Sequence, residues 1–172
     1  MKKVLLGLMT ATIVFTACEK DDDDNNGNTL NQQDRDFMMM AAYGNNAEIA
    51  AGQMAAQKGM NLSVRSYGQM MVSDHTVAQA ELDSIADLLD VNLPQGLDSA
   101  HQALAAQLAA ATGYTFDSLY INSQLMDHQV MMNLMQTEIN NGSHQSARGY
   151  AQKYLPKIEM HHHMADSIKN DL

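Results

Sequence analysis

The 172-residue sequence contains one cysteine, two prolines and no tryptophan. A single cysteine excludes a disulfide framework, so the fold depends on its hydrophobic core. Basic residues are scarce, with 10 Lys and Arg against 20 Asp and Glu, and the formal net charge of −10 argues against a nucleic-acid partner. The chain also lacks a nucleophile elbow and a glycine-rich phosphate loop. Little in the sequence therefore supports an enzyme.

The first 17 residues have the pattern of a secretory signal peptide. A basic start at residues 1–3 precedes an apolar run from Val4 to Val14, which is too short to span a bilayer. Cys18 then resembles the cysteine to which lipid is attached in lipoproteins, although Phe15 stands where such signals usually carry leucine. We expect an outer-membrane lipoprotein that faces the periplasm or the cell surface. Ordinary cleavage that leaves a free thiol is the alternative.

Residues 18–33 contain four consecutive aspartates and almost no apolar side chains. Such a segment cannot bury enough apolar surface to become ordered. We interpret it as a disordered tether between the lipidated cysteine and a domain at residues 34–172. An acidic tract directly after a lipidated cysteine also resembles a surface-export signal. The remaining residues are about as many as one domain needs.

The domain is expected to be all-α. Alanine is frequent, there are 15 methionines, and apolar residues recur at three- and four-residue spacing. This spacing predicts long helices at 34–58, 62–89, 115–141 and 144–172, and a short helix at 98–111. Pro156 predicts a kink in the last helix. Short turns and one crossover helix between the second and third long helices predict a four-helix bundle.

Each predicted long helix carries one ionisable residue on its inner face. These residues are Glu48, His75, His128 and His161. Carboxylate and imidazole groups that converge in a bundle core are the components of a zinc, copper or iron site. We therefore predict a transition-metal site, provided that all four residues lie at one level along the helix axes. Additional candidate ligands are Asp74, Glu159 and His162, and candidate acceptors for the imidazole N–H groups are Asp74, Asp117, Asp127 and Tyr120.

Methionine offers a rival set of ligands. Met160 and Met164 flank the three adjacent histidines, and Met71 lies one turn before His75. Thioethers combined with imidazoles suit copper. Methionine more often fills irregular gaps in an alanine-rich core, so ordinary packing is the alternative interpretation of these residues.

Two other interpretations remain open for the histidines. Without a metal, they form a hydrogen-bonded core network with Glu48 and nearby aspartates. A di-iron centre instead requires Glu-x-x-His on two helices. Only Glu159 to His162 has that pattern here, because the second helix carries Asp74-His75. Ferroxidase or oxygenase chemistry is therefore poorly supported.

Four motifs together resemble the DUF4142 family. They are A-x-x-G-x-x-A-E-I-x-x-G at 41–52, M-V-x-D-H-x-x-x-x-x-E-L at 71–82, F-D-x-x-Y with a histidine eight residues later at 116–128, and L-P-x-x-x-x-H at 155–161. The resemblance covers the whole domain. It implies a ferritin-like helical bundle in a secreted or lipid-anchored bacterial protein, and it implies no reaction.

The sequence thus supports two hypotheses of different kinds. In the first, a lipid-anchored protein of the cell envelope binds or buffers a transition metal in its core. In the second, the domain is a non-catalytic interaction or structural module whose histidines only close the core. A homodimer through the methionine-rich stretch at 38–40 belongs to the second hypothesis.

Overall fold

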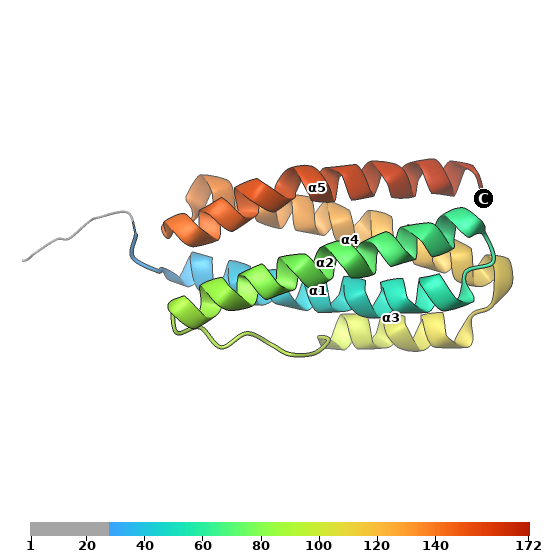
Figure 1. Ribbon diagram of the computed structural model, residues 1–172, viewed down its shortest axis with the longest axis horizontal. Coiled ribbons are helices and arrows are strands. Elements are labelled where there is room, and N and C mark those ends of the chain that lie inside the picture. Colours follow the sequence, from blue (N-terminus) through green and yellow to red (C-terminus); the bar gives the residue numbers. More distant parts are fainter. Residues whose placement is uncertain (1–27) are drawn as a thin grey trace, which may run out of the picture.

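The computed structural model describes residues 28–172, and this part of the chain folds into five α-helices without a strand (Figure 1). They are α1 (Gln32–Lys58), α2 (Leu62–Leu88), α3 (Ser99–Ala110), α4 (Gly113–Asn141) and α5 (Gln145–Asn170). All five predicted segments are helical. The predicted signal peptide, Cys18 and most of the tether lie outside the described residues. No helix within residues 28–172 has the length and apolar character needed to cross a membrane.

The four long helices lie side by side, and α3 lies along the outside of α1 (Figure 1). α1 and α2 form one antiparallel pair, and α4 and α5 form the other. α1 also packs on α4, and α2 packs on α5. Residues 89–98 and α3 carry the chain from one pair to the other. This arrangement gives the four long helices a common interior.

A side-chain cap defines the start of α1. α1 begins two residues earlier than predicted, because Asn31 accepts a hydrogen bond from the Asp34 N–H while Asp34 accepts one from the Asn31 N–H, each at 2.8 Å. Asp34 also accepts from the N–H groups of Ser143 and His144, which ties the start of α1 to the turn before α5. α5 continues through Pro156 without ending.

The core consists of two apolar clusters at different levels along the helices. One includes Phe37, Leu82, Met135 and Tyr150. The other includes Val64, Tyr67, Met71, Leu108, Phe116, Tyr120 and Ile168. On each long helix, the predicted inward ionisable residue lies between the residues of these two clusters. Met38 belongs to the first cluster and is fully buried, so the stretch at 38–40 exposes only Met39 and Met40.

Glycines allow close contact between α1 and α2. A Cβ added at Gly68 would lie 2.7 Å from both the Ala55 Cβ and the Gly52 carbonyl oxygen. A Cβ added at Gly52 would lie 2.8 Å from the Gly68 carbonyl oxygen. Gly52 and Gly68 thus allow the two helix backbones to approach closely.

The substitution Gly68→Ala is expected to destabilise the protein. The added methyl group would overpack the α1–α2 contact, at a cost of about 1–3 kcal/mol in the free energy of unfolding. The matched control is Gly149→Ala in α5, where an added Cβ meets no atom within 4 Å. Because alanine favours helix over glycine, this control should stabilise by about 0.5–1 kcal/mol. Urea unfolding measures both changes, and equal stability of Gly68→Ala and wild type would contradict the close packing.

Candidate metal centre

A polar layer separates the two apolar clusters. Glu48 from α1, His75 from α2, His128 from α4 and His161 from α5 are each at most 5% exposed. The predicted metal site required all four residues to lie at one level along the helix axes. They do so, because each lies between the two apolar clusters. The interior of the protein therefore contains a compact group of ionisable side chains surrounded by apolar residues.

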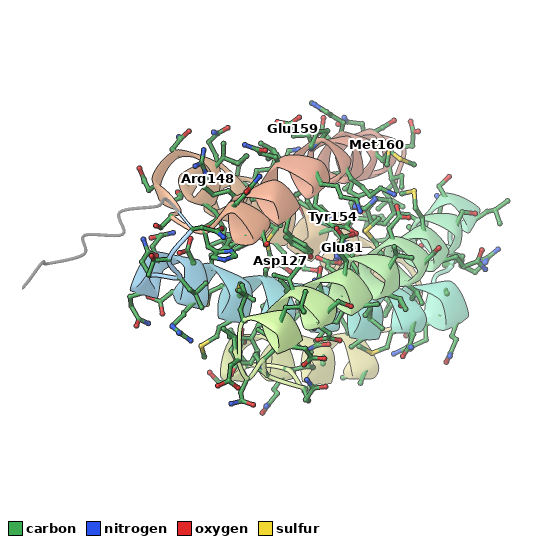
Figure 2. The ribbon with its side chains drawn as sticks, turned by 60° about the vertical axis from the view of Figure 1, so that its left-hand side comes forward. Glu81, Asp127, Arg148, Tyr154, Glu159 and Met160 are labelled. Carbon is green, nitrogen blue, oxygen red and sulfur yellow. The ribbon has the colours of Figure 1, made fainter. Side chains whose placement is uncertain are left out.

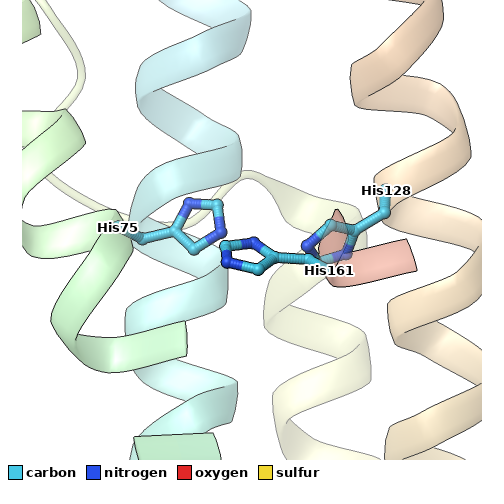
Figure 3. Close-up of side chains that lie close together, drawn as sticks. All are labelled: His75, His128 and His161. Carbon is cyan, nitrogen blue, oxygen red and sulfur yellow. The ribbon is translucent and has the colours of Figure 1, made fainter. Parts of the chain in front are cut away.

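The three imidazoles lie next to one another (Figure 3). Their ring centroids are 5.9 Å apart for His75 and His128, 5.5 Å for His75 and His161, and 5.4 Å for His128 and His161. Each histidine offers one ring nitrogen to a group in which all three nitrogens lie within 4.8 Å of one another. The three histidines are thus close enough to bind one metal ion.

The proton of His75 is positioned by Asn45. The His75 Nδ1 lies 3.0 Å from the Asn45 Oδ1. The Asn45 Nδ2 donates to both the Gln79 Oε1 and the Tyr150 hydroxyl, so the amide oxygen is left as an acceptor. His75 must then donate from Nδ1, which leaves its Nε2 lone pair free.

His128 has the same arrangement with a backbone partner. Its Nδ1 lies 2.9 Å from the carbonyl oxygen of Gln124, which can only accept. The Glu48 Oε1 lies on the same side, 3.6 Å from the His128 Nδ1. The proton of His128 therefore lies on Nδ1, and its Nε2 is free.

His161 is held by a carboxylate. Its Nε2 lies 2.9 Å from the Asp74 Oδ2, and the Lys157 Nζ lies 3.1 Å from the Asp74 Oδ1. Burial raises the pKa of Asp74, but the hydrogen bonds from His161 and Lys157 outweigh burial and hold that pKa below its ordinary value. Asp74 is therefore an anion that accepts from the His161 Nε2, and the His161 Nδ1 is left free.

One nitrogen of each ring thus has no hydrogen-bond partner among the described protein atoms. These atoms are the Nε2 of His75, the Nε2 of His128 and the Nδ1 of His161. A buried polar atom without a partner costs roughly 1–3 kcal/mol. A metal-bound imidazole has this same pattern, in which one nitrogen donates to an acceptor and the other coordinates the ion. The site therefore fits zinc, copper or iron by its donor set.

The three histidines of the site are neutral at pH 7. Burial lowers the pKa of His75 well below 6.5, and it lowers the pKa of His128 to about 3. Burial lowers the pKa of His161 as well, although Asp74 opposes that effect. Neutral imidazole is the form that binds a metal. No proton has to leave these three rings before a metal binds.

Comparison with known proteins places this chain in a family. The model of a domain of unknown function, DUF4142, matches residues 20–168. The chain belongs to the DUF4142 family. This match confirms the resemblance that the four motifs predicted. The comparison with curated proteins finds no match.

The fold of this DUF4142 protein also occurs in a solved structure. The crystal structure of a DUF305 fragment from Deinococcus radiodurans is similar with a TM-score of 0.74, over 83% of this chain and 99% of the fragment. The two sequences are 9% identical, so the similarity concerns the fold alone.

Glu48 has a different place in the candidate site from the three histidines. Its carboxylate lies near the Nδ1 of His128, opposite the free Nε2, and its Oε2 has no partner among the described protein atoms. Burial, followed by the negative charge of Asp127, raises the pKa of Glu48 to about 8. The close group of possible ligand atoms found in residues 28–172 consists of the three histidines without Glu48. Glu48 is therefore a neighbour of the imidazoles.

Met160 and Met164 do not share a site with His161. His161 is fully buried, whereas Met160 and Met164 are 42% and 39% exposed. Figure 2 shows Met160 and Glu159 on the outer side of α5. Consecutive residues of a helix point about 100° apart, so neighbours in the sequence do not share a face. The grouping of these methionines with His161 was therefore wrong.

The remaining candidate ligands and acceptors differ in where they lie. Asp74 contacts His161 as an acceptor. Glu159 is exposed and His162 is half-buried, and neither belongs to the close group. Asp117 instead accepts from the N–H groups of Met60 and Asn61 at the α1–α2 turn.

Two acceptors were missed in the sequence. Asn45 lies one turn before Glu48 on the inner face of α1, so its position contained the signal, although an amide does not titrate. The carbonyl of Gln124 had no sequence signal, because every residue carries such a group.

Proposed function

We propose that this DUF4142 protein binds one transition metal ion, zinc, copper or iron, through His75, His128 and His161. The observation that carries the proposal is the set of three buried imidazoles, each with one nitrogen held by an acceptor and the other nitrogen free. A metal bound by three imidazoles retains at least one further position for water or another ligand. The role that follows is metal binding or buffering.

A core network without metal explains the same residues less well. Such a network is expected to satisfy the polar groups that it buries. Here the partners of the rings are Asn45, the Gln124 carbonyl and Asp74, and one nitrogen of every ring lacks a partner. Three buried ring nitrogens at one place are therefore left without a protein partner. One metal ion bound at this place would give all three nitrogens a partner.

We further propose that the domain is a ferritin-like four-helix bundle held at the cell envelope by lipid on Cys18, as an outer-membrane lipoprotein. The packing of the four long helices and the sequence of the first 33 residues support this proposal. A ferroxidase role has less support, because Glu159 is exposed and the glutamate of the Glu-x-x-His pattern does not reach the interior.

A metal titration tests the proposed function. The full chain, purified without a metal-affinity column and treated with a chelator, is titrated with zinc, copper and iron(II) ions. We expect one ion per chain and a higher melting temperature, because an ion at 100 times its Kd stabilises the folded state by about 2.7 kcal/mol. If none of the three ions binds, the histidines form a core network and the interaction-module hypothesis takes the place of this one.

A further inference from the structure

A cavity of ≈ 90 Å³ connects the surface to the histidines. Its lining includes Met40 and Val130, which are 48% and 59% exposed, and also His75 and His128, which are 4% and 1% exposed. The cavity therefore extends from solvent to two of the three proposed ligands. Its volume accommodates several water molecules, so a partly hydrated ion fits inside it.

The polar lining of this cavity is acidic. It includes Asp98, Asp127 and Glu48, and no lysine or arginine of the described chain lines it. His101 accompanies them, and its Nδ1 lies 2.8 Å from the Asp98 Oδ2. Asp98 and Asp127 place carboxylates in a narrow passage with apolar walls, and such groups attract cations and repel anions.

Glu48 connects these carboxylates to the metal centre. It is 5% exposed, its Oε2 has no partner among the described protein atoms, and its Oε1 lies 3.6 Å from the His128 Nδ1. A second, smaller cavity is lined by Glu48, His101 and Asp127 too. Glu48 lines the cavity, so its carboxyl group can contact a cation that passes through.

We propose that this cavity is the path by which a hydrated divalent cation reaches the histidines, and that Asp127 and Glu48 bind the cation in transit. The inference rests on the proposed function, because a path requires a metal centre at its end. Asp127 lies directly before His128 on α4 and lines the cavity from that helix. Asp127 affects the rate at which the metal ion enters the site, whereas the three histidines determine how tightly the ion is held at equilibrium.

Cobalt(II) uptake tests the path. Metal-free full-length protein is mixed with cobalt(II) ions in a stopped-flow instrument, and the visible absorption of imidazole-bound cobalt is followed with time. Asp127→Asn removes a negative charge from the cavity and should slow uptake by roughly 3- to 10-fold at low ionic strength. Val130→Lys adds a positive charge at the exposed mouth and should slow uptake similarly. Both variants should still bind one cobalt per chain, and added salt should reduce their difference from wild type.

Each variant has a matched control with the same change of charge. Asp87→Asn changes an exposed aspartate near the end of α2, and Val77→Lys changes a valine that is 62% exposed on α2. Neither residue lines the cavity. Uptake that is slower in Asp127→Asn and Val130→Lys than in these controls supports the path. If Asp127→Asn does not fold, the two lysine variants decide, because both change exposed side chains.

The outcomes separate the path from the metal centre. If wild type develops no cobalt absorption, the metal centre is overturned and the path with it. If wild type binds cobalt but the cavity variants load as fast as their controls, only the path is overturned.

Discussion

Replacing His161 with glutamine is expected to lower the affinity for zinc, copper or iron by more than about 100-fold, because loss of a residue that merely orients a ligand already costs 10- to 100-fold. His161 is fully buried, and its Nδ1 has no partner among the described protein atoms. A glutamine amide can still donate to Asp74. The variant therefore removes the free ring nitrogen, while Asp74 keeps a hydrogen-bond donor at this position. Competition with a chromophoric chelator measures the change.

The matched control is His163→Gln. His163 lies two residues further along α5 and is exposed, and its ring is outside the close group of three histidines. This control removes one histidine from the same turn and should leave affinity and stoichiometry unchanged. If His161→Gln still binds a full equivalent of metal, or if both variants lose affinity equally, the ions bind at the surface histidines and the proposed centre is wrong.

Replacing His128 with glutamine is expected to flatten the pH dependence of stability of the metal-free protein. Burial lowers the pKa of His128 to about 3 in the folded state, against 6.5 for an ordinary histidine. Between these values the unfolded chain takes up a proton that the folded protein does not. The contribution of His128 is therefore constant above pH 6.5 and falls by about 1.4 kcal/mol for each pH unit below it.

Urea unfolding at a series of pH values, with chelator present, measures this effect. The slope for wild type minus the slope for His128→Gln should approach about 1.4 kcal/mol per pH unit at roughly one to two pH units below 6.5. Groups that do not interact with His128 change the slope of both proteins alike. Glu48 acts in the opposite direction: burial raises its pKa to about 8, so its contribution to stability is lost as the pH rises from 4.5. The difference between the two proteins removes such shared terms. Equal slopes would show that His128 is protonated in the folded state.

Helical periodicity sufficed to predict the helices and the inner-face position of Glu48, His75, His128 and His161. Whether the four residues lie at one level depends on how the helices are shifted along their axes relative to one another. The sequence of a single helix does not determine that shift. The two apolar clusters on either side of the polar layer fix this shift. The division of the apolar residues into two clusters follows from the packing of the helices and not from any one of them.

The finer chemistry of the site depended on side-chain geometry. Glu48 was predicted to face inward, and it does, but which nitrogen of His128 it approaches depends on its rotamer. The grouping of Met160 and Met164 with His161 was wrong because adjacency in the sequence was given more weight than helical direction. Asn45 was missed because only titratable residues were considered as partners for the imidazoles.

X-ray absorption of the zinc-loaded protein tests the metal centre most directly. The account predicts a shell of nitrogen ligands at about 2.0–2.1 Å from the zinc, with the scattering signature of three imidazole rings. The same spectrum is expected for His163→Gln, and a spectrum with fewer imidazoles is expected for His161→Gln. A shell made only of oxygen, a sulfur ligand from methionine, or identical spectra for wild type and His161→Gln would contradict a centre formed by His75, His128 and His161.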